Sequence, residues 1–314
     1  MIPRVSVVIP TYNHARWVGD AIRSVAAQRF RDLEIIVVDD GSTDDTARVV
    51  RDTGVPLRYI HQSNRGLSGA RNTGVDAAHG SLVGFLDADD LWLPDKLALQ
   101  VPVLDARAEA AIVYADAIFW DAPAGRALGT HAARHRHPSG RILAAILHDN
   151  PITSPTPLVR REALVQAGGF DESLRACEDW DMWIRIARRA EIHCIERPLA
   201  VYRLHGDNMH GDVARMKHHQ HIVLRRALAD PTLPAALRRR GPALVAERHL
   251  DFAITHFGRG EFAAARGELL RAIAWRPRLL LDPRVGPRLL VSLLGRTAAG
   301  RLVAWRRVAH SRAA

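Results

Sequence analysis

The chain has 314 residues, of which 47% are hydrophobic, which suits one large domain with a substantial core plus a smaller appendage. Its two cysteines, Cys177 and Cys194, are too few for a disulfide framework, so we expect both as free buried thiols in a reducing compartment. The formal net charge is +10, but residues 1–200 carry 23 basic and 26 acidic side chains while residues 201–314 carry 21 and 8, so the positive excess belongs to the C-terminal part.

The first apolar segment is Val5 to Pro10, a β-branched run typical of a parallel strand that is covered on both faces. Because this strand starts so close to the N-terminus, and because no run of 18 apolar residues follows, we expect no signal peptide, no transmembrane helix and a cytoplasmic location. A polar loop, Thr11 to His14, comes next, and apolar residues from Trp17 to Ala26 then recur at helical spacing.

A second apolar strand, Leu33 to Val38, runs directly into Asp39 and Asp40. Strand, helix and strand in this order predict an open α/β sheet, in which ligands bind outside the carboxyl ends of the strands. The acid pair fits two roles. It can cap the following helix, or it can accept hydrogen bonds from a nucleotide.

The most informative segment is GFLDADDLWLPD, residues 84–95. Its three acids, Asp87, Asp89 and Asp90, follow a buried strand and precede more apolar residues. Acids this close repel one another unless a hard divalent cation takes their oxygens, and Mg²⁺ commonly shares such carboxylates with substrate phosphates. The segment therefore predicts a metal and diphosphate site, with an acidic surface turn as the alternative; Lys96 is expected as a solvated helix residue.

Two later segments place polar residues beside apolar helices or strands. In CEDWD, residues 177–181, the acids stand in the first turn of an amphipathic helix, where dipole and capping effects explain them without any catalytic role. In YRLHGDN, residues 202–208, an arginine and a histidine are neighbours. The arginine, Arg203, suits contact with a diphosphate, and the histidine, His205, suits contact with either a diphosphate or a metal ion.

Four segments together resemble the family 2 glycosyltransferases of GT-A fold. They are VSVVIPTYNH, VVDDGSTDDT, the run from NRGLSGARN to FLDADD, and GGFDE followed by ED, in the family's order and approximate spacing over about residues 3–210. The resemblance implies a Rossmann-like α/β domain with a mainly parallel central sheet, over residues 1–215. Residues 216–314 fall outside it and are expected to form a basic α-helical appendage.

The resemblance also implies a donor site and a metal site. Asp89 is the main expected ligand of Mg²⁺ or Mn²⁺, supported by Asp87 and Asp90. The residues expected to contact the nucleotide sugar are Pro10, Thr11, Tyr12, Asp39, Asp40, Arg71, Asn72, Asp87, Ala88, Asp89, Arg203 and His205.

The catalytic base that the resemblance implies is Asp179, with Glu178 in local support. The implied reaction moves a sugar from a UDP or dTDP sugar to the hydroxyl of a glycan or lipid-linked glycan, with inversion, in cell-surface polysaccharide or glycolipid assembly. A carboxylate near the acceptor deprotonates the hydroxyl as it attacks. The sequence identifies neither the sugar nor the acceptor, and Ala117 to Pro157 shows no interpretable pattern.

Other functions fit the residues less well. A nucleotidyltransferase of related fold is expected to carry a glycine-rich phosphate loop after the first strand, where this chain has TYNHARW. The G-x-G-x-x-G of dinucleotide oxidoreductases is absent there as well. A non-catalytic, membrane-associated scaffold that binds sugar nucleotides remains an alternative.

The basic C-terminal region admits two interpretations. Apolar residues in Leu289 to Leu294 and Leu302 to Trp305 alternate with arginines, as in a helix at the surface of an anionic membrane, which implies peripheral contact with the inner face of the plasma membrane. The alternative is an arginine-rich, solvated helical cap. Nucleic acid is not expected as a partner, because no aromatic platform or binding-fold signature accompanies the charge.

Overall fold

The computed structural model of the protein describes residues 2–133, 135–206, 208 and 211–293. Its internal contacts separate the chain into two compact units, residues 1–219 and residues 220–314. The boundary expected at residue 215 falls inside helix α8 (Val213–Ala229). Residues 294–314, which include the arginine-rich segment around Leu302 to Trp305, lie outside the described residues.

The first unit alternates strands and helices. Its strands are β1 (Val5–Thr11), β2 (Leu33–Asp39), β3 (Arg58–His61), β4 (Leu82–Phe85), β5 (Leu91–Trp92), β6 (Ala110–Asp121), β7 (Arg126–Thr130), β8 (Leu158–Arg160) and β9 (Glu191–Leu204). Its helices before α8 are α1 (Val18–Ala26), α2 (Thr46–Asp52), α3 (Gly66–Ala77), α4 (Lys96–Ala106), α5 (Leu143–His148), α6 (Arg161–Gln166) and α7 (Glu178–Ala187).

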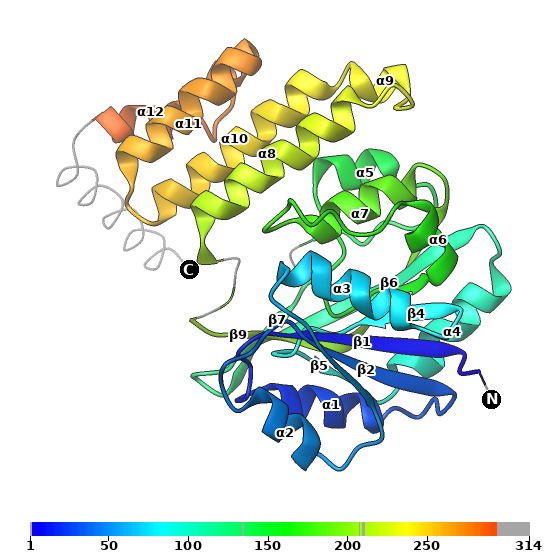
Figure 1. The fold of residues 1–314 in the computed structure, drawn as a ribbon. Helices are drawn as coiled ribbons and strands as arrows, with labels where there is room; N and C mark the ends of the chain where they lie inside the picture. Colours follow the sequence, from blue (N-terminus) through cyan, green and yellow to red (C-terminus); the bar gives the residue numbers. More distant parts are fainter. Residues whose placement is uncertain (1, 134, 207, 209–210, 294–314) are drawn as a thin grey trace. The chain divides into compact units, whose positions relative to one another are not determined.

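One nine-stranded sheet organises this unit, with the strand order β3-β2-β1-β4-β8-β6-β9-β5 and β7 paired to β6. The half made of β3, β2, β1 and β4 is parallel, and β6 and β9 are parallel to each other. Strand β8 runs antiparallel to both β4 and β6 and joins the two halves. Figure 1 shows α1 and α2 on one face of the parallel strands and α3 on the other.

The packing explains why the parallel strands are apolar throughout. Every residue of β1 is buried, because helices cover both faces of the sheet. Helix α1 presents Val18, Ala21, Ile22 and Val25 to the core at helical spacing. On the other face, α3 approaches β1 at Gly74, where a Cβ atom would lie 2.2 Å from Val8 Cγ1.

The carboxyl ends of the parallel strands carry the polar residues that the sequence singles out. Thr11 ends β1 and pairs in register with Asp39, which ends β2. The DADD turn follows β4, the other neighbour of β1. Residues far apart in the chain therefore meet along one edge of the sheet, as expected for an open α/β fold.

Two expectations about individual side chains need correction. Lys96 is fully buried rather than solvated: its Nζ donates to Gln100 Oε1 at 2.6 Å and lies 4.0 Å from the centre of the Trp92 ring. Burial lowers the pKa of Lys96 well below its usual value. Both cysteines are free, but only Cys177 is buried, whereas Cys194 is half-buried.

The second unit is helical where it is described. Beyond α8 it contains α9 (Ala235–Arg238), α10 (Gly241–Gly258), α11 (Phe262–Trp275), a 3₁₀ helix η2 (Pro277–Leu281) and α12 (Gly286–Leu293). Its core is formed by Ala246, Leu250, Ala253, Leu269, Ala272, Leu279 and Val285. The expectation of additional C-terminal helices is confirmed. Among the described residues, no helix is both long enough and apolar enough to cross a bilayer.

Candidate active site

The two acids at the end of β2 are buried and hold neighbouring loops in place. Asp40 accepts hydrogen bonds from the backbone N–H groups of Arg65 and Gly66 at 2.9 and 2.7 Å, so it caps the start of α3 rather than that of α2. Asp39 accepts from the backbone N–H of Ser42 at 2.7 Å and from the Tyr59 hydroxyl at 2.5 Å. Each carboxylate has four acceptor positions, so acceptor capacity remains for a bound nucleoside.

The loop after β1 lies beside these acids. Thr11 is buried, and its Oγ1 has no hydrogen-bond partner among the described residues. Tyr12, next along, is 46% exposed, whereas Pro10 is buried within the strand. A buried, unpartnered hydroxyl next to an exposed aromatic ring suits contact with a ligand's polar and planar groups.

Arg71 connects the two acidic segments. Its guanidinium, 3% exposed, donates from Nη2 to Asp87 Oδ1 at 2.8 Å and from Nη1 to Glu178 Oε1 at 2.5 Å. Burial opposes the charge, but the carboxylates of Asp87 and Glu178 raise the pKa of Arg71, so it stays protonated. This bridge brings the DADD turn and the start of α7 together, although 91 residues separate Asp87 from Glu178 in the chain.

Asn72, the next residue on α3, holds the GGFDE segment. Its Oδ1 accepts from the backbone N–H of Phe170 at 2.7 Å, and its Nδ2 donates to the carbonyl oxygen of Phe170 at 2.9 Å. The turn before Phe170 needs its two glycines, because Gly168 and Gly169 have φ of +85° and +75°. Asn72 is therefore placed by the structure as a link between α3 and this turn.

The three acids of the DADD turn have different surroundings. Asp87 and Asp89 are partly exposed, with 22% and 16% of their side chains accessible. Asp90 is buried, and its Oδ1 accepts from the backbone N–H of Arg203 at 2.9 Å while Oδ2 has no partner among the described residues. Burial and the neighbouring acids Asp89 and Asp87 raise the pKa of Asp90 well above its usual range.

This donor set fits a hard divalent ion. Mg²⁺ is usually held by one or two carboxylates together with substrate phosphates, and Asp87 and Asp89 offer such oxygens at the accessible edge of the turn. As the side chains stand, groups of three ligand atoms within 4.8 Å of one another occur elsewhere in the described chain, at Asp116, His131 and His137 and at Glu109, Glu191 and His193. An ion that is also held by substrate phosphates does not require three protein ligands in this way.

Residues at and just after the end of strand β9 contact the DADD turn. His205 Nε2 lies 3.0 Å from Asp89 Oδ2, and its ring stacks on Trp17 with the ring centres 5.3 Å apart. Arg203 donates from Nε to the carbonyl oxygen of Asp89 and from Nη1 to Asp20 Oδ2 at 3.3 Å. Its Nη2 is buried and has no partner among the described residues, so one donor remains for a ligand.

Asp179 lies at the start of α7, after Cys177, whose backbone is left-handed with φ of 59°. One oxygen, Oδ2, accepts from the Asn150 amide at 3.2 Å, and the other accepts from the backbone N–H of Trp180. Burial and the nearby Glu178 raise the pKa of Asp179 to about 7. Glu178 itself points to Arg71, so Asp179 is the acid of this turn that is not paired with a cation.

Several residues of the site were missed by the sequence reasoning. Trp17 was noted only as the first of several apolar residues at helical spacing, but it stacks on His205 and lies 4.7 Å from the Arg203 guanidinium. Asn150, the partner of Asp179, lies in a segment without an interpretable pattern. Asn208 donates to the carbonyl oxygen of Arg203 at 3.1 Å. Of these three residues, only Trp17 could have been suspected from the sequence, because it is an aromatic residue in the loop after β1.

Comparison with known proteins defines the class. The model of the glycosyl transferase family 2 matches residues 6–167, just over half of the chain, and the chain belongs to this family. An uncharacterized glycosyltransferase of Rickettsia felis is 33% identical over 207 residues, which are 65% of this chain and 33% of that protein. The chain therefore spans about a third of the length of this curated relative.

Solved structures with the same fold cover nearly the whole chain. TarS residues 1–349 of Staphylococcus aureus, in complex with UDP-GlcNAc, aligns with 97% of this chain and 92% of its own at a TM-score of 0.65 and 18% identity. The mannosyltransferase PcManGT of Pyrobaculum calidifontis, in complex with GDP-Man and Mn²⁺, aligns with 98% and 88% at 0.63 and 22%. The expected fold class, a GT-A α/β domain with added C-terminal helices, is confirmed.

Proposed function

We propose that this chain transfers a sugar from a UDP or dTDP sugar to the hydroxyl of a glycan or lipid-linked glycan, with inversion at the anomeric carbon. Asp179 acts as the base. The observation that carries the proposal is the Arg71 bridge, which joins the DADD acids to the helix turn that holds Asp179. The UDP-GlcNAc in the TarS structure and the GDP-Man in the PcManGT structure support a nucleotide-sugar donor.

In this proposal, residues at the carboxyl ends of different strands contact different parts of the donor. Asp39, Asp40, Thr11 and Tyr12 contact the nucleoside, while Arg203 and His205 lie beside the DADD turn where the diphosphate would bind. Asp87 and Asp89 would hold Mg²⁺ or Mn²⁺, which supplies charge stabilisation to the leaving diphosphate. Arg71 and Asn72 keep the surrounding turns in place.

The raised pKa of Asp179 supports its role as the base. A general base works best when its pKa lies near the working pH, and the pKa of Asp179 is raised to about 7. The Asn150 amide contacts one carboxylate oxygen and orients the group. The deprotonated carboxylate takes the proton of the acceptor hydroxyl as the oxygen attacks the sugar.

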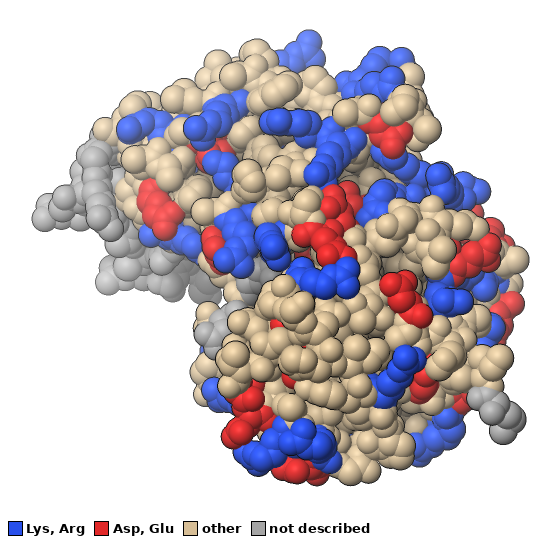
Figure 2. Space-filling model, viewed as in Figure 1, with Lys and Arg blue, Asp and Glu red and all other residues tan. Residues whose placement is uncertain are grey.

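Contact with an anionic membrane is part of the proposal, because the acceptor is expected on lipid. In the second unit, Leu280, Leu281, Leu290 and Leu293 are 56–88% exposed on η2 and α12, which also carry Arg278 and Arg288. Figure 2 shows lysine and arginine side chains in several separate groups over the visible face, so charge alone marks no single patch. Exposed leucines next to arginines favour a peripheral location on the inner face of the plasma membrane.

The test is a donor screen with matched variants. The full chain is incubated with Mn²⁺, a panel of UDP, dTDP and GDP sugars and glycan acceptors, and release of free nucleotide is measured. Asp179→Asn should lower the rate by roughly 10²- to 10⁴-fold while donor affinity is retained, because only the proton acceptor is lost. The control is Asp181→Asn on the same helix, whose carboxylate pairs with Arg185 at 2.8 Å and which should remain active.

The dependence on pH gives a second readout. Since the base must be deprotonated, the wild-type rate should rise with pH through about 7, and the residual rate of Asp179→Asn should lose this rise. An α-linked donor should give a β-linked product. Retention of the α linkage, or near-normal turnover of Asp179→Asn, would contradict the mechanism, and absence of turnover with every donor would favour a non-catalytic binding protein.

A further inference from the structure

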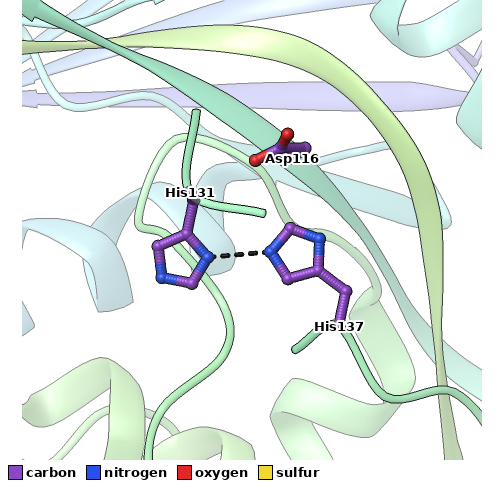
Figure 3. Close-up of side chains that lie close together, drawn as sticks. All are labelled: Asp116, His131 and His137. Carbon is purple, nitrogen blue, oxygen red and sulfur yellow. Dashed lines mark hydrogen bonds between the residues drawn. The ribbon is translucent and has the colours of Figure 1, made fainter. Parts of the chain in front are cut away.

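A cluster of imidazoles and one carboxylate lies in the first unit, apart from the residues assigned to donor and base. Asp116 is in β6, and His131 and His137 belong to the segment that follows β7. His131 Nδ1 and His137 Nε2 are 2.8 Å apart, and one ligand atom from each of the three side chains lies within 4.8 Å of the others. Figure 3 shows the two rings facing each other, with the Asp116 carboxylate to one side of the pair.

Two members of the cluster are buried, His137 is half-buried, and the charge of the carboxylate is not balanced by a cation of the described chain. Asp116 is 3% exposed and His131 is 8% exposed. The Asp116 carboxylate accepts at Oδ1 from the backbone N–H groups of Ala117 and Ala132, at 2.8 and 2.9 Å, and no lysine or arginine of the described chain forms an ion pair with it. A buried carboxylate without a cation is costly, which makes a bound positive ion favourable here.

The imidazoles have lone pairs available. Burial, with the nearby His135 and His137, lowers the pKa of His131 to about 4, and burial also lowers the pKa of His137. Two ring nitrogens 2.8 Å apart cannot both carry a proton toward each other, so at least one of the two facing atoms presents a lone pair. The Nδ1 atom of His137 is buried and has no hydrogen-bond partner among the described residues.

We propose that Asp116, His131 and His137 bind one divalent ion of the zinc class, through a carboxylate oxygen, His131 Nδ1 and His137 Nε2. Two imidazoles and one carboxylate suit zinc and its neighbours in the first transition row, whereas Mg²⁺ prefers oxygen ligands alone. Three protein ligands leave a fourth position for water or a small ligand.

To accept the ion, the two nitrogens, 2.8 Å apart, must separate, and the Asp116 oxygen, within 4.8 Å of them, must lie at a similar distance from both. With metal–nitrogen distances of about 2.0–2.1 Å and tetrahedral angles, two nitrogen ligands stand about 3.3 Å apart, so the rings move apart slightly. The proton that the two facing nitrogens share shifts to the other nitrogen of its own ring, and no net charge is lost. The ion would tie His131 and His137 to Asp116 in β6.

A second group of potential ligands is less suited. Glu109, Glu191 and His193 also place ligand atoms within 4.8 Å of one another, but Glu109 is exposed. Glu191 already lies 3.0 Å from His193 and 3.9 Å from Arg141. This group serves as the internal comparison in the test.

The experiment measures zinc binding by the full, untagged chain without nucleotide. After dialysis against a chelator, Zn²⁺ titration followed by calorimetry and by metal analysis should show one ion per chain. His131→Ala and His137→Ala should each weaken this binding at least about 10-fold. Two controls should keep it: Asp89→Asn, which alters the donor site, and His193→Ala, which alters the comparison group.

Spectroscopy of the wild type makes the test independent of how the variants fold. Co²⁺ in place of Zn²⁺ should give the visible absorption of a four-coordinate site, and X-ray absorption at the zinc edge should show two imidazole ligands. Circular dichroism checks the fold of each variant. The proposal is wrong if the wild type binds no stoichiometric zinc, if its zinc lacks imidazole ligands, or if folded His131→Ala and His137→Ala bind zinc as the wild type does. Loss of binding in His193→Ala would assign the ion to the other group.

Discussion

Arg71 is the side chain on which the arrangement of the site depends most. It is 3% exposed, and two carboxylates from distant parts of the chain, Asp87 and Glu178, compensate its charge. Loss of the guanidinium would leave Glu178, itself 4% exposed, without a cation, and removal of one partner from a buried pair typically costs about 3–5 kcal/mol. Asp179, the neighbour of Glu178, forms no such ion pair, and burial together with the charge of Glu178 raises its pKa even though Arg71 lies near enough to oppose the shift.

At the scale of single residues, we predict that a divalent ion strengthens donor binding and that Asp89 is one of its ligands. Asp89→Asn replaces an anionic ligand with a neutral one, so the affinity for a nucleoside diphosphate in the presence of Mn²⁺ should fall by roughly 10- to 100-fold or more. Calorimetry with UDP or dTDP, with and without Mn²⁺, measures this. The affinity measured without Mn²⁺ should change little.

The matched control is Asp76→Asn, since Asp76 is an exposed acid on α3. It changes the net charge of the chain equally but should leave Mn²⁺-dependent binding intact. If Asp89→Asn binds UDP and dTDP in Mn²⁺ as tightly as the wild type, the ion is held elsewhere.

At the scale of elements, helix α3 connects the parts of the site. Asp40 caps its N-terminus, Arg71 and Asn72 project from it to the DADD turn and the GGFDE segment, and Gly74 lets it lie close to β1. The helix carries few large apolar residues, so its position depends on this close approach and on its polar contacts. A shift of α3 would disturb both the donor side and the base side.

We therefore predict that Gly74→Ala destabilises the first unit, although alanine is a better helix former than glycine. The new Cβ would lie 2.2 Å from Val8 Cγ1, and overpacking of this kind costs about 1–3 kcal/mol. Denaturant unfolding followed by circular dichroism measures the change.

The control substitution has the opposite expected sign. In α11, a Cβ at Gly267 would meet only Arg271 Nη1, at 3.8 Å, so Gly267→Ala should raise the free energy of unfolding by up to about 1 kcal/mol. Equal stabilisation by both substitutions would show that α3 does not pack closely on β1.

At the scale of the whole molecule, the two units differ in charge and in exposed apolar surface. The second unit combines its arginines with leucines that face solvent, whereas the first unit has nearly balanced charge. This division of properties suits a chain in which one unit carries the chemistry and the other attaches to a surface.

We predict that the full chain binds anionic lipid vesicles and that exposed leucines contribute. Leu281 and Leu290, which are 88% and 67% exposed, can be changed together to serine with little loss of stability, and vesicle binding should then weaken several-fold. Salt should weaken binding of the wild type, because charges are screened beyond about 10 Å at 0.1 M ionic strength. Co-sedimentation with vesicles measures both effects.

Val165→Ser is the control, because Val165 is 60% exposed on α6 of the first unit and should not contribute. Donor binding should be the same in the wild type, in the double serine variant and in Val165→Ser. Absence of vesicle binding by the wild type at low salt would leave the second unit as a helical cap.

Much of the fold was predictable from the sequence because local patterns determine it. The β-branched run from Val5 to Pro10 and the helical spacing after it reflect burial on both faces of a sheet and on one face of a helix. The DADD acids were recognisable because three carboxylates within four residues, flanked by apolar sequence, repel one another unless a cation binds them. These signals lie within a few residues of one another, so no distant contact is needed to interpret them.

The tertiary structure alone decided which distant side chains meet. It buried Lys96 against Trp92, stacked Trp17 on His205, and placed Asn150 beside Asp179. It also brought His131 and His137 next to Asp116. The physical reason is that a pairwise contact depends on how strands pair and helices pack over long separations, whereas local sequence determines only periodicity and turns. The sequence by itself determined the α/β class, the edge that carries the acids and the basic C-terminal region; the tertiary structure determined the partners of each charge.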